Sequence, residues 1–146
     1  MLIFSYTCQY AIKACIVLAS ERKKIGIIDI SEQIGTPTHF TSKILQQLTK
    51  KQLISSGRGK GGGFYLNDEQ FEKLTIQDIY ENLERKGVLS SCLLGLKICS
   101  SENPCPIHDM AVVVKEKVKI IFDYKIKDLK DLGSVMKMME YPGSTS

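Results

Sequence analysis

The chain has 146 residues, of which 43% are hydrophobic and 25% are charged, as in a small globular protein and unlike a disordered tail. No apolar run approaches the roughly 18 residues of a membrane span, and no basic segment precedes the first apolar stretch, so we expect a cytoplasmic protein. The net charge of +4 is unevenly placed: residues 1–66 hold nine Lys or Arg and three Asp or Glu, and residues 67–146 hold eleven and thirteen. The basic first half suggests a polyanionic partner, with nucleic acid as the leading candidate.

Three helices are predicted in the first part of the chain. Apolar residues at helical spacing predict an amphipathic helix over residues 4–20, and a short helix over Ile27–Ile34 is expected to end at Gly35. Thr36 is expected to cap a third helix that runs to about Lys51. The apolar stripe of this third helix consists of Phe40, Ile44, Leu45 and Leu48.

A basic hairpin is predicted after the third helix. Residues 53–56 and 64–66 read as short strands, and the glycines of the turn at residues 58–63 allow the positive φ angles of a tight hairpin. Two helices joined by a short turn and followed by such a hairpin form a winged helix-turn-helix. We therefore predict a mainly α fold with a small β wing: a winged helix-turn-helix DNA-binding domain over residues 1–67, and a sensor loop with dimerisation helices over residues 68–146.

The third helix is the expected DNA recognition helix. Its early polar residues are predicted to face away from the apolar stripe, where hydroxyl, imidazole and ammonium groups can reach phosphates and base edges. The basic side chains at the tip of the wing can enter a minor groove or contact the DNA backbone. The candidate DNA-binding residues are Thr38, His39, Thr41, Ser42, Lys43, Gln46, Arg58 and Lys60.

A helix followed by an irregular segment is predicted next. Thr75 and Asp78 nearly match a capping box, so a helix is expected over Thr75–Glu84. Residues 86–107 contain glycine, serine and proline and show no periodicity, so they are expected to be irregular.

A long helix is predicted over residues 107–124, and a last short helix over residues 128–139. The long helix has an apolar side but little of its own domain left to pack against. We therefore expect a homodimer formed along it. This side consists of Met110, Val113, Val114, Lys117, Val118, Ile121 and Phe122.

Five cysteines are present, and they fall into two groups. Cys8 and Cys15 lie two turns apart in the first predicted helix, where core positions are expected. The other three lie close together in the irregular segment. An odd count in a reducing compartment argues against a disulfide framework.

The second group has the spacing Cys92-x6-Cys99-x5-Cys105, with His108 three residues later. Thiolates and an imidazole in one loop favour Zn²⁺ or an iron–sulfur cluster. Structural zinc motifs are usually built from CxxC pairs, which are absent, so the wide gaps suit a cluster wrapped by a loop. The alternative interpretation is three ordinary cysteines and a surface histidine; His108 could equally cap the long helix.

Two other functions are less consistent with the sequence. An enzyme with Cys105 as nucleophile and His108 as base would have only Asp109 as an orienting carboxylate. A protein–protein adaptor would be expected to have a neutral wing, whereas this wing carries Arg58 and Lys60. We therefore expect neither an enzyme nor a small-molecule substrate.

Four segments carry a resemblance to a known family. They are Tyr10–Ala14, Ile44–Leu48 followed by Leu53-Ile54, the wing Arg58–Leu66, and the three cysteines before the long helix. On these segments the chain resembles the family of dimeric winged-helix regulators that includes IscR, NsrR and CymR, over residues 1–140. The wing is the most specific of the four.

The resemblance implies a homodimer that binds a partly palindromic operator in double-stranded DNA. It also implies a 2Fe–2S or 4Fe–4S cluster whose state controls DNA affinity, and which an aerobically prepared sample can lack. Cys92, Cys99 and Cys105 correspond to the three thiolate ligands, and His108 to the histidine ligand of IscR-like members. Arg58 corresponds to the wing arginine that reads the minor groove.

Two alternatives stay open. NsrR-like members take a fourth ligand from an acidic residue near the partner's N-terminus, where this chain has Cys8 and Gln9, so Cys8 is an alternative to His108. The second alternative concerns the function. The expected function is a transcriptional regulator, a repressor, whose cluster senses iron–sulfur status, redox state or nitric oxide. The alternative is a regulator of the same fold that uses its cysteines as a direct thiol-redox or zinc sensor.

Overall fold

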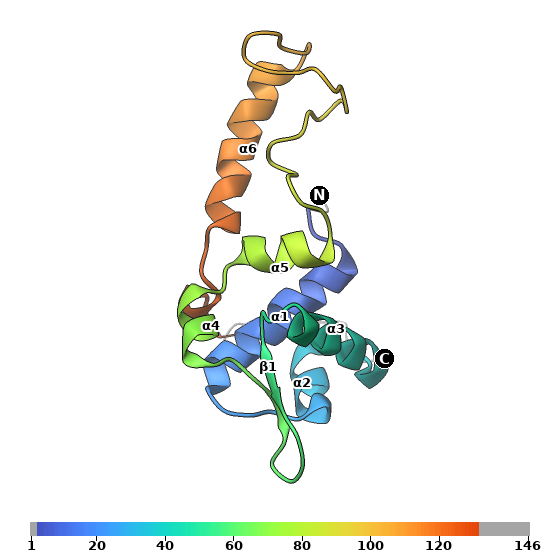
Figure 1. Ribbon diagram of the computed structural model, residues 1–146, viewed down its shortest axis with the longest axis vertical. Coiled ribbons are helices and arrows are strands. Elements are labelled where there is room, and N and C mark those ends of the chain that lie inside the picture. The colour runs from blue at the N-terminus through green and yellow to red at the C-terminus, as the bar shows by residue number, and fades with distance from the viewer. Residues whose placement is uncertain (1–2, 132–146) are drawn as a thin grey trace, which may run out of the picture.

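A computed structural model describes residues 3–131 of the chain. This part is mainly helical and contains one two-stranded sheet, as predicted (Figure 1). Its helices are α1 (Tyr6–Glu21), α2 (Ile27–Ile34), α3 (Thr38–Lys50), α4 (Asp68–Lys73), α5 (Ile76–Leu83) and α6 (His108–Phe122); its strands are β1 (Ser55–Gly57) and β2 (Gly63–Tyr65); and a 3-10 helix, η1, spans Ile126–Asp128.

Helix α1 lies at the centre of the fold. Ser5 caps it by accepting a hydrogen bond from the backbone N–H of Cys8 at 3.1 Å. Helices α2, α3, α5 and η1 all pack against α1. The elements around α1 each place fully buried side chains in one core, and burying such a side chain contributes roughly 1.5–3 kcal/mol. These side chains include Leu18, Ile30, Leu45, Leu48, Ile54, Ile79 and Ile126.

The turn between α2 and α3 differs from the sequence prediction. Gly35 ends α2 in the left-handed conformation, as expected. The prediction that Thr36 caps α3 is wrong, because Pro37 occupies the N-cap position and its carbonyl accepts the first helical hydrogen bonds. Thr36 lies one residue too early, and its buried hydroxyl has no hydrogen-bond partner among the described residues.

The wing is a short antiparallel hairpin that is anchored to the loop before α2. Its register pairs Ser55 with Tyr65 and Gly57 with Gly63, so β1 begins two residues later than predicted. Gly63 has φ +148°, and a Cβ atom there would lie 2.5 Å from the carbonyl oxygen of Ile25. Only glycine fits this position, where the wing hydrogen-bonds to the backbone of Ile25.

Two short helices follow the wing. Helix α5 begins with the capping box predicted at Thr75 and Asp78, in which each side chain bonds the other residue's backbone N–H. Helix α4 also has a capping box, formed by Asn67 and Gln70, but sequence analysis did not predict it. It has six residues and buries none of them, so it carries no apolar periodicity from which a helix could be inferred.

The long helix α6 forms an arm that extends from the rest of the fold, here called the body (Figure 1). Its end at Phe122 packs into the body, with ring centroids 5.9 Å from Phe4 and 4.9 Å from Tyr80. Its other end carries the loop at residues 84–107, called the cysteine loop. The predicted helix at 128–139 falls largely outside the described residues, and residues 129–131 are not helical. Within residues 3–131, no helix is long and apolar enough to cross a membrane.

Candidate metal centre and nucleic-acid interface

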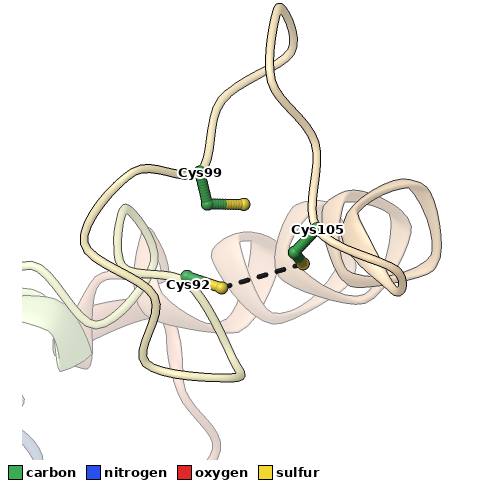
Figure 2. A group of neighbouring side chains, drawn as sticks. All are labelled: Cys92, Cys99 and Cys105. Atoms are coloured by element: carbon green, nitrogen blue, oxygen red, sulfur yellow. Dashed lines mark hydrogen bonds between the residues drawn. The ribbon is translucent and has the colours of Figure 1, made fainter.

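Three cysteines converge at the tip of the arm. The Sγ atoms of Cys92, Cys99 and Cys105 all lie within 4.8 Å of one another, and those of Cys92 and Cys105 are 3.7 Å apart. Figure 2 shows the three side chains pointing toward a common centre from different stretches of the loop. All three are half-buried free thiols. The three cysteines are thus widely spaced in the sequence, but their sulfur atoms form one compact set of donors.

Two turns within the cysteine loop bring the sulfur atoms together. Between Cys92 and Cys99 the chain reverses direction at Gly95, which has φ +73° and donates its N–H to the carbonyl of Cys92 at 3.0 Å. Between Cys99 and Cys105 it reverses again where the backbones of Ser100 and Asn103 exchange hydrogen bonds of 3.2 Å. Each turn folds the chain back between two cysteines, which explains why gaps of six and five residues suit this site.

His108 adds a nitrogen donor to the same place. It is the first residue of α6, and its Nδ1 atom lies 3.2 Å from Sγ of Cys99. Its backbone N–H also donates to the carbonyl of Cys105 at 3.0 Å. The N-cap of α6 is Ile107, and no side chain caps the helix there. The imidazole therefore faces a thiol, and the histidine does not act as the helix cap.

The thiols of the site differ in acidity. Hydrogen bonds from the backbone of Leu96 and Leu94 lower the pKa of Cys92 to about 7. Burial raises the pKa of Cys105. Because the thiolate is the form that binds metals, the lowered pKa of Cys92 favours its role as a ligand near neutral pH.

The donor set fits a soft metal ion or an iron–sulfur cluster. Three sulfurs and one imidazole nitrogen surround a small cavity of about 40 Å³, and thiolates favour Zn²⁺ and iron–sulfur clusters over hard cations. The Lys115 ammonium donates to the carbonyl of Ser91, which fastens the start of the loop to α6. The site is therefore built on the cysteine loop and the first turn of α6, and this hydrogen bond connects the loop to the same helix.

The two remaining cysteines are core residues. Cys8 and Cys15 are fully buried in α1, and burial raises the pKa of each thiol to about 12. The negative charge of Glu84 contributes to the shift at Cys8. Both positions match the core placement that the sequence favoured.

The outer surface of α3 carries most of the predicted DNA-binding residues. Thr38, His39, Lys43 and Gln46 are exposed. Ser42 is half-buried, and its hydroxyl accepts a hydrogen bond from the Gln46 amide at 3.1 Å. These polar groups form one continuous side of the helix, opposite the core.

Two sequence predictions about α3 are wrong. Thr41 was expected to face outward, but it is 1% exposed and its hydroxyl donates to the carbonyl of Pro37 at 3.2 Å. Phe40 was expected in the apolar stripe, but it is 51% exposed and its ring lies 4.4 Å from that of His39. At about 100° per residue, position 41 falls between the buried Ile44 and Leu45, whereas position 40 falls on the flank.

The wing places two cations beside α3. Arg58 and Lys60 are exposed at its tip, where Gly59 and Gly61 adopt left-handed backbone conformations. A groove of about 1080 Å³ lies between the wing, the start of α2 and the start of α3, and Thr38, His39 and Ser42 line it together with residues of the wing and of α2. The exposed polar side of α3 and the basic tip of the wing therefore lie next to this groove and are the candidate nucleic-acid contacts.

Comparison with known proteins agrees with this arrangement. The pattern of the family described as Rrf2, iron-dependent transcriptional regulator, matches residues 4–131. An HTH-type transcriptional regulator of Aquifex aeolicus is 32% identical over 146 residues, covering 98% of this chain and 99% of the relative. The regulator IscR of Photorhabdus laumondii is 31% identical over 102 residues, covering 68% of this chain and 61% of IscR.

Solved structures share the fold. CymR, the global cysteine regulator of B. subtilis, matches with a TM-score of 0.66 at 20% identity, covering 96% of this chain and all of CymR. IscR of T. potens matches with a TM-score of 0.63 at 21% identity, covering 99% of this chain and 93% of that one. The mainly helical winged-helix fold predicted from the sequence is confirmed, and the relatives are regulators of transcription, not enzymes.

Proposed function

The chain belongs to the Rrf2 family of iron-dependent transcriptional regulators, and from this premise we propose that it is a cytoplasmic repressor controlled by an iron–sulfur cluster. The ligands are Cys92, Cys99, Cys105 and His108. The observation that carries the proposal is the convergence of three thiol sulfurs within 4.8 Å, with an imidazole nitrogen 3.2 Å from one of them. A redox-reactive or nitric-oxide-reactive centre is the chemistry that a bound cluster supplies.

The DNA-binding unit acts as a homodimer on a two-fold symmetric operator. Helix α3 enters the major groove and presents His39, Lys43 and Gln46, while Arg58 and Lys60 of the wing reach the minor groove or the backbone. Two such units read half-sites about 34 Å apart. Thr41 is not among the contacts, because its side chain is buried.

An apolar surface on α6 supports the dimer. Four of the seven residues predicted on the apolar side of this helix are large apolar side chains that are 43–64% exposed, and within the described chain they face solvent. A second copy of the same helix is a natural cover, because most oligomers are closed and symmetric. The four residues are Met110, Val113, Val114 and Ile121.

Ligand binding and operator affinity are coupled through the start of α6. The N–H of His108 bonds the carbonyl of Cys105, and Lys115 bonds the carbonyl of Ser91, so the cysteine loop and α6 form one unit. When a bound ligand holds the four donors together, this unit is rigid; when the ligand is lost, the loop can shift against α6. A small shift changes the separation of the two α3 helices that read the half-sites. A working switch requires a coupling free energy of about 1–3 kcal/mol between ligand binding and operator affinity.

The test is a titration of labelled operator DNA with anaerobically purified protein before and after iron removal. Iron and sulfide counts and a visible absorbance spectrum establish whether the cluster is present. We expect at least a fivefold difference in operator affinity between the two forms. Equal affinity for both forms would overturn the switch.

A second candidate is a direct thiol sensor, favoured by the 3.7 Å between the sulfurs of Cys92 and Cys105. A peroxide oxidant would accept two electrons and two protons from this thiol pair, forming one disulfide and releasing water. Peptide mapping of iron-free, peroxide-treated protein tests this candidate. A disulfide between Cys92 and Cys105 that changes operator affinity supports the thiol sensor, and unchanged affinity excludes it. A stoichiometric zinc content would indicate a zinc sensor.

A further inference from the structure

The wing carries a third cation in addition to Arg58 and Lys60. Lys24 lies in the loop before α2, and its side chain is exposed. The next residue, Ile25, forms an antiparallel bridge with Phe64 of β2, so this loop lies along the hairpin. Ile25 is 5% exposed and belongs to the core. Because successive side chains of an extended chain point to opposite faces, Lys24 points to the outer face of the wing, away from the core.

The side chain of Lys24 runs along this outer face toward the tip of the wing. Its Nζ atom lies 5.5 Å from the centroid of the Tyr65 ring, a cation–π contact that orients it. The bridge at Ile25 places the Lys24 backbone level with Tyr65. A Cβ atom at Gly57 would lie 2.9 Å from the same Nζ, and Gly57 pairs two positions nearer the tip. The ammonium therefore lies beside the residue that precedes Arg58.

The outer face of the wing is distinct from the face that meets α3. Phe64 and Ser56 line the groove between the wing and α3, whereas Lys24 and Tyr65 are not among its lining residues. Gly57 does not have a positive φ angle, so its backbone conformation is open to other residues. What Gly57 provides is the space in which the ammonium lies.

The charge of Lys24 is free to bind an anion. Its neighbour Lys23 pairs with Glu21 at 3.7 Å, but no carboxylate of the described residues lies within 4.0 Å of the Lys24 ammonium. The wing projects from the end of the body opposite the arm, so pairing along α6 would not cover it (Figure 1). A hairpin that enters a minor groove about 6 Å wide has a row of phosphates on each side. Lys24 faces the row on the side away from α3.

We propose that Lys24 binds a phosphate of the DNA strand that borders the outer face of the wing. The wing would then be held from this face while its tip contacts the groove. This inference rests on the proposed function and extends its interface by one residue in each chain. Phosphate contacts fix the position of a protein on the duplex but carry no base information. Lys24 should therefore contribute affinity for every DNA sequence and no sequence preference.

The salt dependence of DNA binding tests the assignment. The probes are an operator duplex that the wild-type protein selects from a random pool, and a scrambled duplex of equal length. Lys24→Met removes the charge but keeps an apolar stem that can pack on Tyr65. The slope of the logarithm of the binding constant against the logarithm of the salt concentration should become smaller by about one unit for each bound chain. Affinity for both duplexes should fall roughly fivefold to tenfold per chain at about 0.1 M salt.

Two variants are matched controls. Lys24→Arg keeps the positive charge and should retain the wild-type slope. Lys23→Met removes the adjacent charge, which is 72% exposed and paired with Glu21, and should change affinity by about twofold or less. An unchanged slope in Lys24→Met, or a loss confined to the operator duplex, would overturn the phosphate contact. An equal loss in Lys23→Met would show that only the net charge of the wing matters, and would overturn it as well.

Neutral methylphosphonate groups, placed at one phosphate of the operator at a time, locate the contact. One position in each half-site should weaken binding by the wild-type protein but not by Lys24→Met, because both changes remove the same contact. The absence of any such position would contradict the proposal. Wild-type binding that Lys24→Met leaves unchanged defeats only the role of Lys24. A wild-type chain that selects no sequence and binds no duplex defeats the proposed function and the role of Lys24 together.

Discussion

The body and the arm of this protein differ in how completely they bury their own side chains. In the body, α1 is surrounded by helices, and Leu45 and Leu48 are fully buried. In the arm, α6 buries only Ala111 and Phe122, and its other apolar side chains face solvent or are half-buried. The body is complete in one chain. The arm leaves apolar side chains exposed within residues 3–131 and carries the proposed metal ligands, so we expect it to be the part that responds to a signal.

The largest expected contrast between the regions is in iron binding. Cys105→Ser removes one of three converging sulfurs, so we expect the iron content of anaerobically purified protein to fall by at least tenfold. Cys15→Ala, the matched change in the body, should leave iron content unchanged while lowering the free energy of unfolding. Inductively coupled plasma analysis measures the iron. Full iron content in Cys105→Ser would exclude that thiolate as a ligand.

The reactivity of the cysteine thiols at a given pH should also differ between the two regions. With the pKa of Cys8 and Cys15 raised from 9.0 to about 12, iron-free folded protein at pH 8 should react with iodoacetamide at the three loop cysteines and leave these two unlabelled. The unfolded state ionises these thiols first, so their contribution to stability is present below pH 9 and declines as the pH rises toward 12. Mass spectrometry counts the labels. Rapid labelling of Cys8 in folded protein would contradict its burial.

Core truncation should affect the body far more than the arm. Leu45→Ala removes a fully buried side chain and should lower the free energy of unfolding by about 2–5 kcal/mol. Leu96→Ala, at a position 49% exposed, should change the stability of the isolated chain by about 0.5 kcal/mol or less. Urea unfolding at a concentration that keeps the protein monomeric measures both. A large effect of Leu96→Ala under those conditions would show that the arm packs within its own chain.

Substitutions at the wing should have smaller effects than the core truncation. Arg58→Ala should weaken operator binding by about 1–3 kcal/mol if the guanidinium reads a groove. Lys60→Ala should weaken binding to all DNA sequences, because it removes a single phosphate contact. The slope of the logarithm of the binding constant against the logarithm of the salt concentration should become smaller by about one unit. Fluorescence anisotropy at several salt concentrations separates the two roles. Unchanged operator binding by Arg58→Ala would remove that residue from the interface.

Sequence reasoning succeeded where the signal was local. The capping box at Thr75 and Asp78 and the Gly35 helix stop each depend on contacts within four residues, and the structure confirms both. It failed at the start of α3, where Phe40 and Thr41 exchange their expected places. One turn of helix holds too few residues to define the apolar side, so packing against α1 decides which neighbour is buried.

The sequence by itself determined the family, the winged helix and the four donors that are proposed as ligands. Turn glycines, helical spacing and the presence of thiols can each be recognised within a short stretch of sequence. Only the tertiary structure decided that two turns bring the sulfurs of Cys92, Cys99 and Cys105 together beside His108. It also decided that Phe40 is exposed on α3 while Thr41 beside it is buried. Convergence and exposure depend on distances between segments far apart in the chain, which spacing along the chain does not specify.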